Sequence, residues 1–110
     1  MAQIREVHLR SEGSYIIIIP SGLYVNAGDI ARFIADDNYT YEIVISNKDK
    51  FFVSNDGATI EKQVSQGQPA DTPAINNNKP TSTTKYYTVT RADIDSTCSP
   101  PKIIIISSQI

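Results

Sequence analysis

The chain has 110 residues, of which 40% are hydrophobic and 20% charged, and its formal net charge is −2. This length fits one domain with a single core, over residues 1–110, and the scattered Lys and Arg argue against the basic face that nucleic-acid binding needs. No apolar run approaches the roughly 20 residues of a membrane span. The N-terminus MAQIREVHLR lacks an apolar signal-peptide core, so we expect either a cytosolic protein or a mature form with an added Met.

Strand signals follow one another along the chain, with β-branched and aromatic residues between turn residues. YTYEIVIS, residues 39–46, alternates cleanly between two faces. FFVSNDGATIEKQV, residues 51–64, predicts a hairpin, because Asp56-Gly57 supplies the positive φ angles of a tight turn. We expect about eight strands, in residues 3–9, 14–20, 30–35, 39–46, both arms of 51–64, 85–90 and 102–107, with a short extended piece at 23–25 and a turn at 26–29.

Two segments lack this strand pattern. Residues 65–84, SQGQPADTPAINNNKPTSTT, hold three prolines and three consecutive asparagines, with little that could be buried, so we expect a long, flexible surface loop. Residues 93–97 could form one helical turn at most. Short strands without an amphipathic helix predict an all-β fold, an antiparallel Greek-key β-sandwich of about seven or eight strands.

Four isoleucines occur in a row twice, in SYIIIIP at 14–20 and in PKIIIIS at 101–107. A strand with one wet face alternates apolar and polar residues, whereas four isoleucines place two side chains on each face. The runs therefore predict one of two arrangements. Either they lie covered in the middle of the fold, where they could pair with each other, or they form an outer apolar patch that a partner or a second copy buries.

Catalytic motifs are absent once their context is considered. DIDST at 93–97 matches an aspartate-nucleophile pattern, but that motif needs a large α/β domain after it. The carboxylates in ADDNYT, residues 35–40, are interpreted as turn residues rather than calcium ligands. His8 is the only histidine and Cys98 the only cysteine, about 90 residues apart, and the sequence does not combine them into a catalytic relay. We therefore expect no enzyme activity and no cofactor.

Two segments resemble the cupredoxins, the small blue-copper β-sandwich proteins, and plastocyanin-like members in particular. LYVNAGDIARFIADDNYTYEIVIS, residues 23–46, resembles the family's path through a Gly-Asp turn into a strand headed by a copper-binding histidine, a position that falls on Tyr41. TCSPPKIIIIS, residues 97–107, resembles the Cys-Ser-Pro-His ligand loop, but Pro101 takes the place of the second histidine. The only Met is Met1. The resemblance therefore implies a cupredoxin-like sandwich without a type 1 copper centre, which needs two imidazoles and a thiolate.

Cys98 is interpreted as a buried, inert residue at one pole of the sandwich, since no neighbouring charge except Lys102 would activate its thiol. The leading function is a non-catalytic binding or assembly module that takes a protein partner or a second copy through its apolar strands. Its contact residues would come from the isoleucine runs or from aromatic residues near loops, which are equally ordinary core residues. These candidates are Ile17, Ile19, Ile104, Ile106, Tyr39, Tyr41, Phe51 and Phe52.

Two other classes of function stay open. A metal-binding or redox domain would use Cys98 together with His8. An immunoglobulin-like adhesion or carbohydrate-binding domain is also compatible with the strand count, which does not distinguish one sandwich topology from another.

Overall fold

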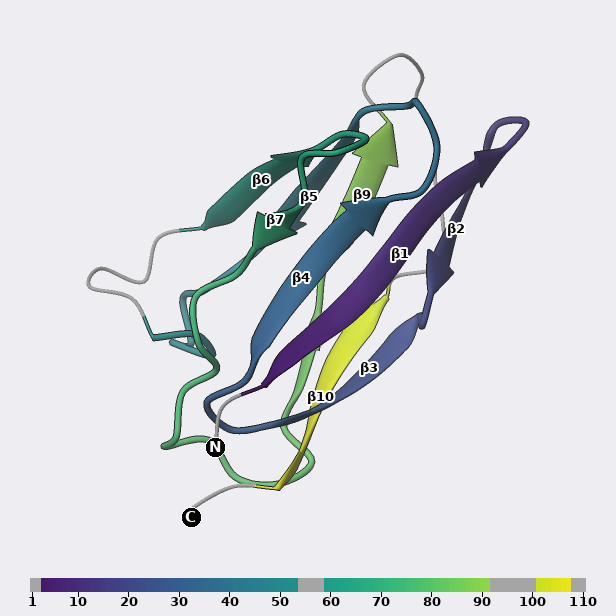
Figure 1. Cartoon of the computed structure of the whole chain (residues 1–110). Coiled ribbons are helices and arrows are strands. Elements are labelled where there is room, and N and C mark those ends of the chain that lie inside the picture. Colours follow the sequence, from purple (N-terminus) through teal and green to yellow (C-terminus); the bar gives the residue numbers. More distant parts are fainter. Residues whose placement is uncertain (1–2, 54–58, 92–100, 108–110) are drawn as a thin grey trace.

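The computed structural model describes residues 3–53, 59–91 and 101–107, and every element within them is a strand (Figure 1). The strands are β1 (Ile4–Glu12), β2 (Tyr15–Ile19), β3 (Gly22–Asn26), β4 (Ile30–Ala35), β5 (Tyr41–Ile45), β6 (Ile60–Val64), β7 (Ala70–Asp71), β8 (Thr84–Tyr86), β9 (Thr88–Arg91) and β10 (Lys102–Ser107). No helix in these ranges is long and apolar enough to cross a membrane. The all-β prediction is confirmed.

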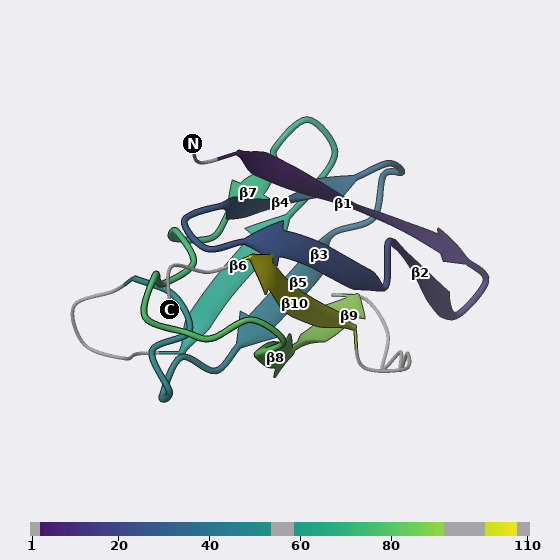
Figure 2. The same cartoon turned by 90° about the horizontal axis from the view of Figure 1, so that it is seen from below.

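The strands form two layers. One is a four-stranded sheet in the order β2-β1-β4-β7, and the other holds two three-stranded sheets, β3-β10-β8 and β6-β5-β9. Only Tyr87 separates β8 from β9, and its backbone N–H donates to the carbonyl of Pro101 at 3.1 Å. The segment 84–91 therefore joins the two smaller sheets side by side. Seen from below, β1, β4 and β7 lie across from β5, β8 and β9 (Figure 2).

The core lies between the layers because the strands alternate. In β4 every second residue is buried, and β5 follows the same pattern, as period-2 strands with one inner face do. The rings of Phe33 and Tyr87, from opposite layers, meet edge-to-face with centroids 5.4 Å apart. The buried apolar residues include Val7, Leu9, Leu23, Val25, Phe33, Tyr41, Ile43, Ile45, Phe51, Phe52, Val64, Ile75, Val89, Ile103 and Ile105.

Strand pairing is mixed rather than purely antiparallel. β1 pairs with β4 in parallel, and β3 pairs with β10 in parallel, so the predicted antiparallel sandwich contains two parallel pairs. The cause is a change of layer: β2 ends before Pro20, β3 continues in the other layer, and β4 returns beside β1. A connection through the opposite layer brings the chain back in the same direction, which a tight hairpin cannot do.

Two local predictions differ from the structure. β6 pairs with β5 instead of with residues 51–53, and Phe52 forms a bridge with Ile75, so the predicted 51–64 hairpin is wrong in its partner. The predicted Asp56-Gly57 turn and the helical turn at 93–97 lie outside the described residues. The predicted single strand at 85–90 is divided between the two smaller sheets of its layer.

The segment 65–84 contributes to the core, although its composition suggested little to bury. Ile75 is 1% exposed and Thr72 is 3% exposed. The backbone N–H of Thr72 donates to the carbonyl of Ala31 at 2.9 Å, and its Oγ1 accepts from the N–H of Ala31 at 3.1 Å. The segment therefore extends the edge of β4, where β7 adds a short antiparallel pair. The predicted surface loop therefore contains a short strand and two buried residues, which its composition did not indicate.

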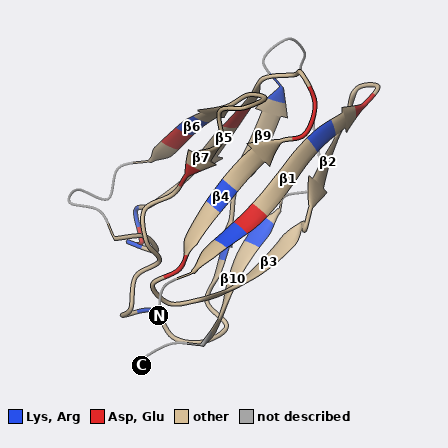
Figure 3. Cartoon of the chain, viewed as in Figure 1, with Lys and Arg blue, Asp and Glu red and all other residues tan. Residues whose placement is uncertain are grey.

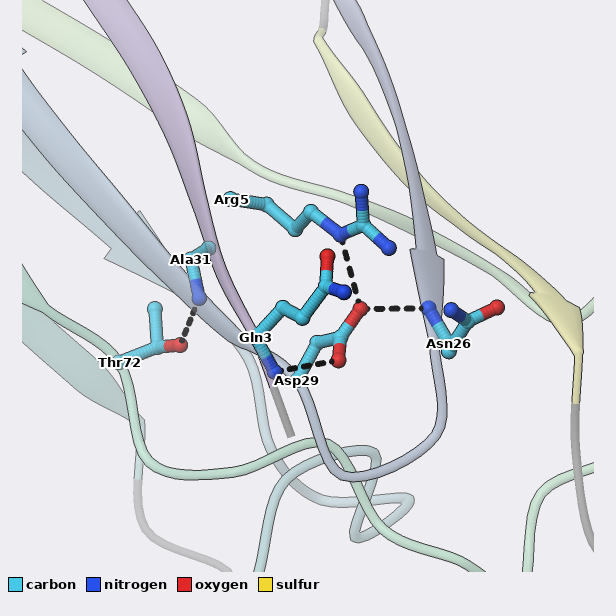
Figure 4. A network of polar contacts seen from close by, with 6 residues as sticks. All are labelled: Gln3, Arg5, Asn26, Asp29, Ala31 and Thr72. Carbon is cyan, nitrogen blue, oxygen red and sulfur yellow. Dashed lines mark hydrogen bonds and ion pairs between the residues drawn. The ribbon is translucent and has the colours of Figure 1, made fainter. Parts of the chain in front are cut away.

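A buried carboxylate holds the start of β1 against the turn between β3 and β4 (Figure 4). Asp29 has no exposed surface and accepts from the backbone N–H groups of Gln3 at 2.9 Å and Asn26 at 2.8 Å. Arg5 Nε donates to the same carboxylate at 3.0 Å. Gly28 before it has φ +93°, a conformation that L side chains avoid. The predicted turn at 26–29 is confirmed.

The two isoleucine runs do not pair with each other. The first forms β2, which pairs only with β1 among the described strands and lies at the edge of its sheet. The second forms β10, the central strand between β3 and β8. The two strands therefore bury different numbers of isoleucines. On the edge strand β2 only Ile16 is buried, whereas on the central strand β10 both Ile103 and Ile105 are buried.

Candidate functional site

The pole around the start of β5 is closed by a hydrogen-bonded phenol. Tyr41 is fully buried, and its hydroxyl donates to the carboxylate of Asp37, 3.0 Å from each oxygen. Ser11 Oγ lies 2.8 Å from the same hydroxyl, and its backbone N–H donates to Asp37 Oδ2 at 2.7 Å. Burial, together with the bond to Asp37, raises the pKa of Tyr41 to about 12. Tyr41 is therefore a neutral structural phenol at the position where the sequence resemblance places a copper ligand.

Arg91 completes the same pole. Its side chain is largely buried, and Nη1 donates to the carbonyl of Gly13 at 2.9 Å. The guanidinium carbon lies 4.0 Å from the centroid of the Tyr39 ring, within cation–π range. Tyr39, predicted as a contact residue, is 37% exposed but has one ring face engaged by Arg91. The guanidinium of Arg91 thus covers one face of the Tyr39 ring, and the exposed part of Tyr39 lies elsewhere on its side chain.

His8 lies between two carboxylates on the outer face of β1. Its Nδ1 is 2.9 Å from Asp36 Oδ1, and its Nε2 is 3.3 Å from Glu6 Oε1. The hydrogen bond to Asp36 is the main reason that the pKa of His8 is raised. The carboxylates approach opposite sides of the ring, and no group of three metal-ligating residues occurs in the part of the chain that the structure describes. Cys98, the other residue of the redox hypothesis, lies outside that part.

Three of the predicted contact residues are core residues. Tyr41, Phe51 and Phe52 have no exposed surface. The two phenylalanine rings meet edge-to-face with centroids 5.0 Å apart. A ring buried inside the folded chain cannot contact a partner without unfolding, so the core alternative holds for these three.

The isoleucine runs reach the surface in two separate places. On β2, Ile17 is half-buried and Ile19 is 51% exposed. On β10, Ile103 and Ile105 have no exposed surface, whereas alternate residues point outward. The runs are thus neither wholly core nor wholly surface, because a strand in a two-layer fold has one inner and one outer face.

The largest change from the sequence prediction is on the outer face of β3, β10 and β8. There Ile104 pairs with Tyr24 of β3 on one side, and Lys102 pairs with Tyr86 of β8 on the other. Tyr24 and Tyr86 are each 59% exposed, and Ile106 is 51% exposed. We call Tyr24, Tyr86, Ile104 and Ile106 the tyrosine–isoleucine face. Sequence reasoning missed its tyrosines because it depends on which strands flank β10.

The remainder of the same layer is polar on its outer side. Where β9, β5 and β6 lie together, the exposed residues are Thr88, Thr90, Glu42, Glu61 and Gln63. Charged residues also occur along β1 and β4, whereas β2 and β3 carry none and β10 carries only Lys102 (Figure 3). Tyr24, Tyr86 and Ile106 are thus exposed together on strands that carry few charges, while Tyr15 and Ile19 are exposed on β2, and Ile4, Tyr39 and Val53 are exposed elsewhere.

Comparison with known proteins identifies the fold. No family model and no curated protein matches the chain. Among solved structures, the reduced state of an amicyanin mutant covers 94% of this chain, and 81% of its own chain is covered, with a TM-score of 0.56 and 10% identity. The reduced Cu(I) form of another amicyanin mutant at pH 4 has the same coverage and identity and a TM-score of 0.54.

The chain therefore has a cupredoxin-like β-sandwich fold, since amicyanin is a cupredoxin. The resemblance inferred from residues 23–46 and 97–107 is confirmed at the level of fold, which also decides against the immunoglobulin-like topology. An identity of 10% shows the fold alone, so the copper chemistry of amicyanin does not follow from it.

Proposed function

We propose that this protein is a non-catalytic binding module that contacts a protein partner through the tyrosine–isoleucine face. The observation that supports this is the exposure of Tyr24, Tyr86 and Ile106 on adjacent strands of one sheet. Contiguous apolar surface on a soluble protein marks an interaction site more often than single exposed residues do. Tyrosine and apolar side chains with few charges are also typical of the central part of protein interfaces.

The chemistry of the face indicates the kind of partner. Lys102 lies at the border of this face, paired with Tyr86 of β8, and the aliphatic part of its side chain lies over Gly22, where an added Cβ would be 3.7 Å from Lys102 Cε. The ammonium group therefore borders an apolar surface. A partner of matching chemistry would present apolar or aromatic side chains with one carboxylate at their edge.

The cupredoxin-like scaffold suits this role because its pole is occupied by structural contacts. Tyr41 and Asp37 bond to each other at 3.0 Å, and Arg91 covers the ring of Tyr39. These groups satisfy one another and leave a broad sheet face as the best-supported contact surface. The redox alternative needs Cys98 near His8, whose two ring nitrogens already have carboxylate partners.

The experiment compares capture by the immobilised wild-type protein and by a Tyr24→Ser/Tyr86→Ser variant, using an extract of the producing cells. Both tyrosines are exposed, so the variant should keep its thermal midpoint within a few degrees. A Thr88→Ala/Thr90→Ala variant on the polar half of the layer is the matched control. We expect one captured protein that the control retains and the tyrosine variant loses. Capture that does not depend on the two tyrosines, or no capture at all, contradicts the proposal.

A further inference from the structure

Among the strands that the structure describes, β2 has a neighbour on one side only, and its other edge is the basis of an independent inference. β2 is the first strand of the sheet β2-β1-β4-β7, and its register with β1 runs without a bulge from His8↔Ile19 to Glu12↔Tyr15. Natural edge strands are usually protected by charged residues, prolines or bulges. The strand YIIII has none of these within its five residues, and proline follows only at position 20.

The backbone groups at this edge can be assigned from the hairpin. Gly13 and Ser14 form a two-residue turn with Gly13 at φ +62°, so Glu12 and Tyr15 form the bonded pair that closes it. Bonded and non-bonded pairs alternate in antiparallel strands. Ile17 and Ile19 are then in backbone hydrogen-bonded pairs with their partners on β1, whereas Ile16 and Ile18 are in non-hydrogen-bonded pairs.

Contacts on the far side of β1 support this assignment. The carbonyl of Leu9 accepts from the N–H of Asp36 at 2.8 Å, and the N–H of Ser11 donates to Asp37 Oδ2 at 2.7 Å. Leu9 and Ser11 are the partners of Ile18 and Ile16, and their backbone groups point away from β2. The N–H and C=O groups of Ile16 and Ile18 therefore point to the side of β2 on which no described strand pairs.

We propose that two copies of this protein pair antiparallel through β2, about a two-fold axis at Ile17. In this register Ile16 of one chain faces Ile18 of the other, and each such pair exchanges two N–H···O bonds. All the outward backbone groups of these residues are thereby satisfied, with Ile17 facing its own copy as the non-bonded pair. Because β2 is complementary to itself in this register, the partner that pairs with it is the β2 strand of a second copy of the chain.

The side chains agree with the same register. Tyr15, Ile17 and Ile19 share the outer face of the sheet, where Tyr15 is 72% exposed and Ile19 is 51% exposed. Antiparallel pairing places Tyr15 opposite Ile19 of the second copy, an aromatic–β-branched contact of the kind that stabilises sheets. No charge on β2 opposes the pairing. The two four-stranded sheets would form one continuous sheet.

The test is light scattering after size-exclusion chromatography, over a concentration series of wild-type protein and two lysine variants. We expect a dimer that Ile17→Lys weakens by at least about tenfold, because two ammonium groups would face each other across the axis. Ile104→Lys is the matched control: its isoleucine is also a half-buried residue within an isoleucine run, and this variant should keep the dimer. Circular dichroism establishes that both variants are folded.

An engineered disulfide between two copies tests the proposed register of the β2–β2 pair even if the Ile17→Lys variant fails to fold. In a Cys98→Ser background, Ile17→Cys should form a cross-linked dimer readily, because Cα atoms of a non-bonded pair lie about 4.5 Å apart, within disulfide range. Tyr15→Cys, which faces Ile19, should cross-link at least about tenfold more slowly. A wild-type protein that is monomeric at about 100 μM overturns the inference. A dimer that Ile104→Lys disrupts and Ile17→Lys does not would also overturn it, as would equal cross-linking rates of the Ile17→Cys and Tyr15→Cys variants. The edge of β2 shares no residue with the tyrosine–isoleucine face, and Ile104→Lys is the one variant here that alters this face. A failure of the β2 pairing therefore leaves the proposed function in place.

Discussion

Replacing Asp29 by alanine should destabilise the fold more than any other single carboxylate change described above. The carboxylate accepts from two backbone N–H groups and from Arg5, and it has no exposed surface. A buried donor that loses its acceptor costs about 1–3 kcal/mol. Water can reach the N–H of the exposed Gln3, so Asn26 carries most of this cost, and Arg5 is 31% exposed, so its screened ion pair adds less. We expect a loss of about 2–4 kcal/mol.

Thermal and urea unfolding at pH 7 measure this loss. For a domain of this size it corresponds to a fall in the thermal midpoint of about 8–16 °C, at roughly 4 °C per kcal/mol. Asp29→Asn keeps one acceptor oxygen and should lose about half as much. The matched control is Asp71→Asn, whose carboxylate bonds to Arg32 at 2.7 Å but is 41% exposed, so solvent screens the pair and little change is expected.

The same variant gives a pH signature. Burial by itself raises the pKa of Asp29, but the bonds from Asn26, Gln3 and Arg5 outweigh it and hold the folded-state pKa below the ordinary value of 3.8. A depressed pKa stabilises the fold above the unfolded value, and this contribution is lost as the pH falls through the folded-state pKa. The difference between wild type and Asp29→Ala should shrink below about pH 4. A difference under about 1 kcal/mol at pH 7, or one that does not change with pH, would refute the reasoning.

Three further predictions concern the pole and the metal question. In an ultraviolet titration of the folded protein, the Tyr41 phenol should resist ionisation up to about pH 12 and Tyr41→Phe should lack this late step; a phenol that ionises near pH 10 contradicts the buried bond to Asp37. NMR should give His8 a pKa above 6.5 that falls in Asp36→Asn. Because the folded state raises the pKa of His8, protonated His8 stabilises the fold below about pH 6.5, and this contribution is lost as the pH rises through the folded-state pKa. His8→Gln should abolish this dependence of the unfolding free energy on pH. Adding Cu(II) should produce no intense visible band, and such a band would establish a thiolate–copper site that uses Cys98.

The fold class could be predicted from the sequence because the strand signals are local. Alternation in residues 41–45 and the β-branched run at 102–107 specify strands whatever they pair with. Pairing is a non-local property. Nothing in residues 60–64 shows that their partner is β5, and the division of 84–91 between two sheets depends on Tyr87 turning inward between layers.

The candidate contact surface was predicted in part. Ile104 and Ile106 could be proposed from the isoleucine run, but Tyr24 and Tyr86 join them only because β3 and β8 flank β10. Conversely, Phe51 and Phe52 lie beside loop residues in sequence, where aromatic residues suggest contacts, yet both are buried in the core. Whether an aromatic residue is an anchor or core depends on the layer opposite it, which the local pattern does not contain.

The contact role of the tyrosine–isoleucine face is tested most directly by hydroxyl-radical labelling of tyrosines, in the cell extract and again on the purified protein. In the purified protein Tyr24 and Tyr86 should label strongly, as their 59% exposure requires, while buried Tyr41 should not. In the extract the partner should protect Tyr24 and Tyr86 together, by about fivefold or more if most of the face is covered. Equal labelling of these two tyrosines in both samples would contradict the proposed contact.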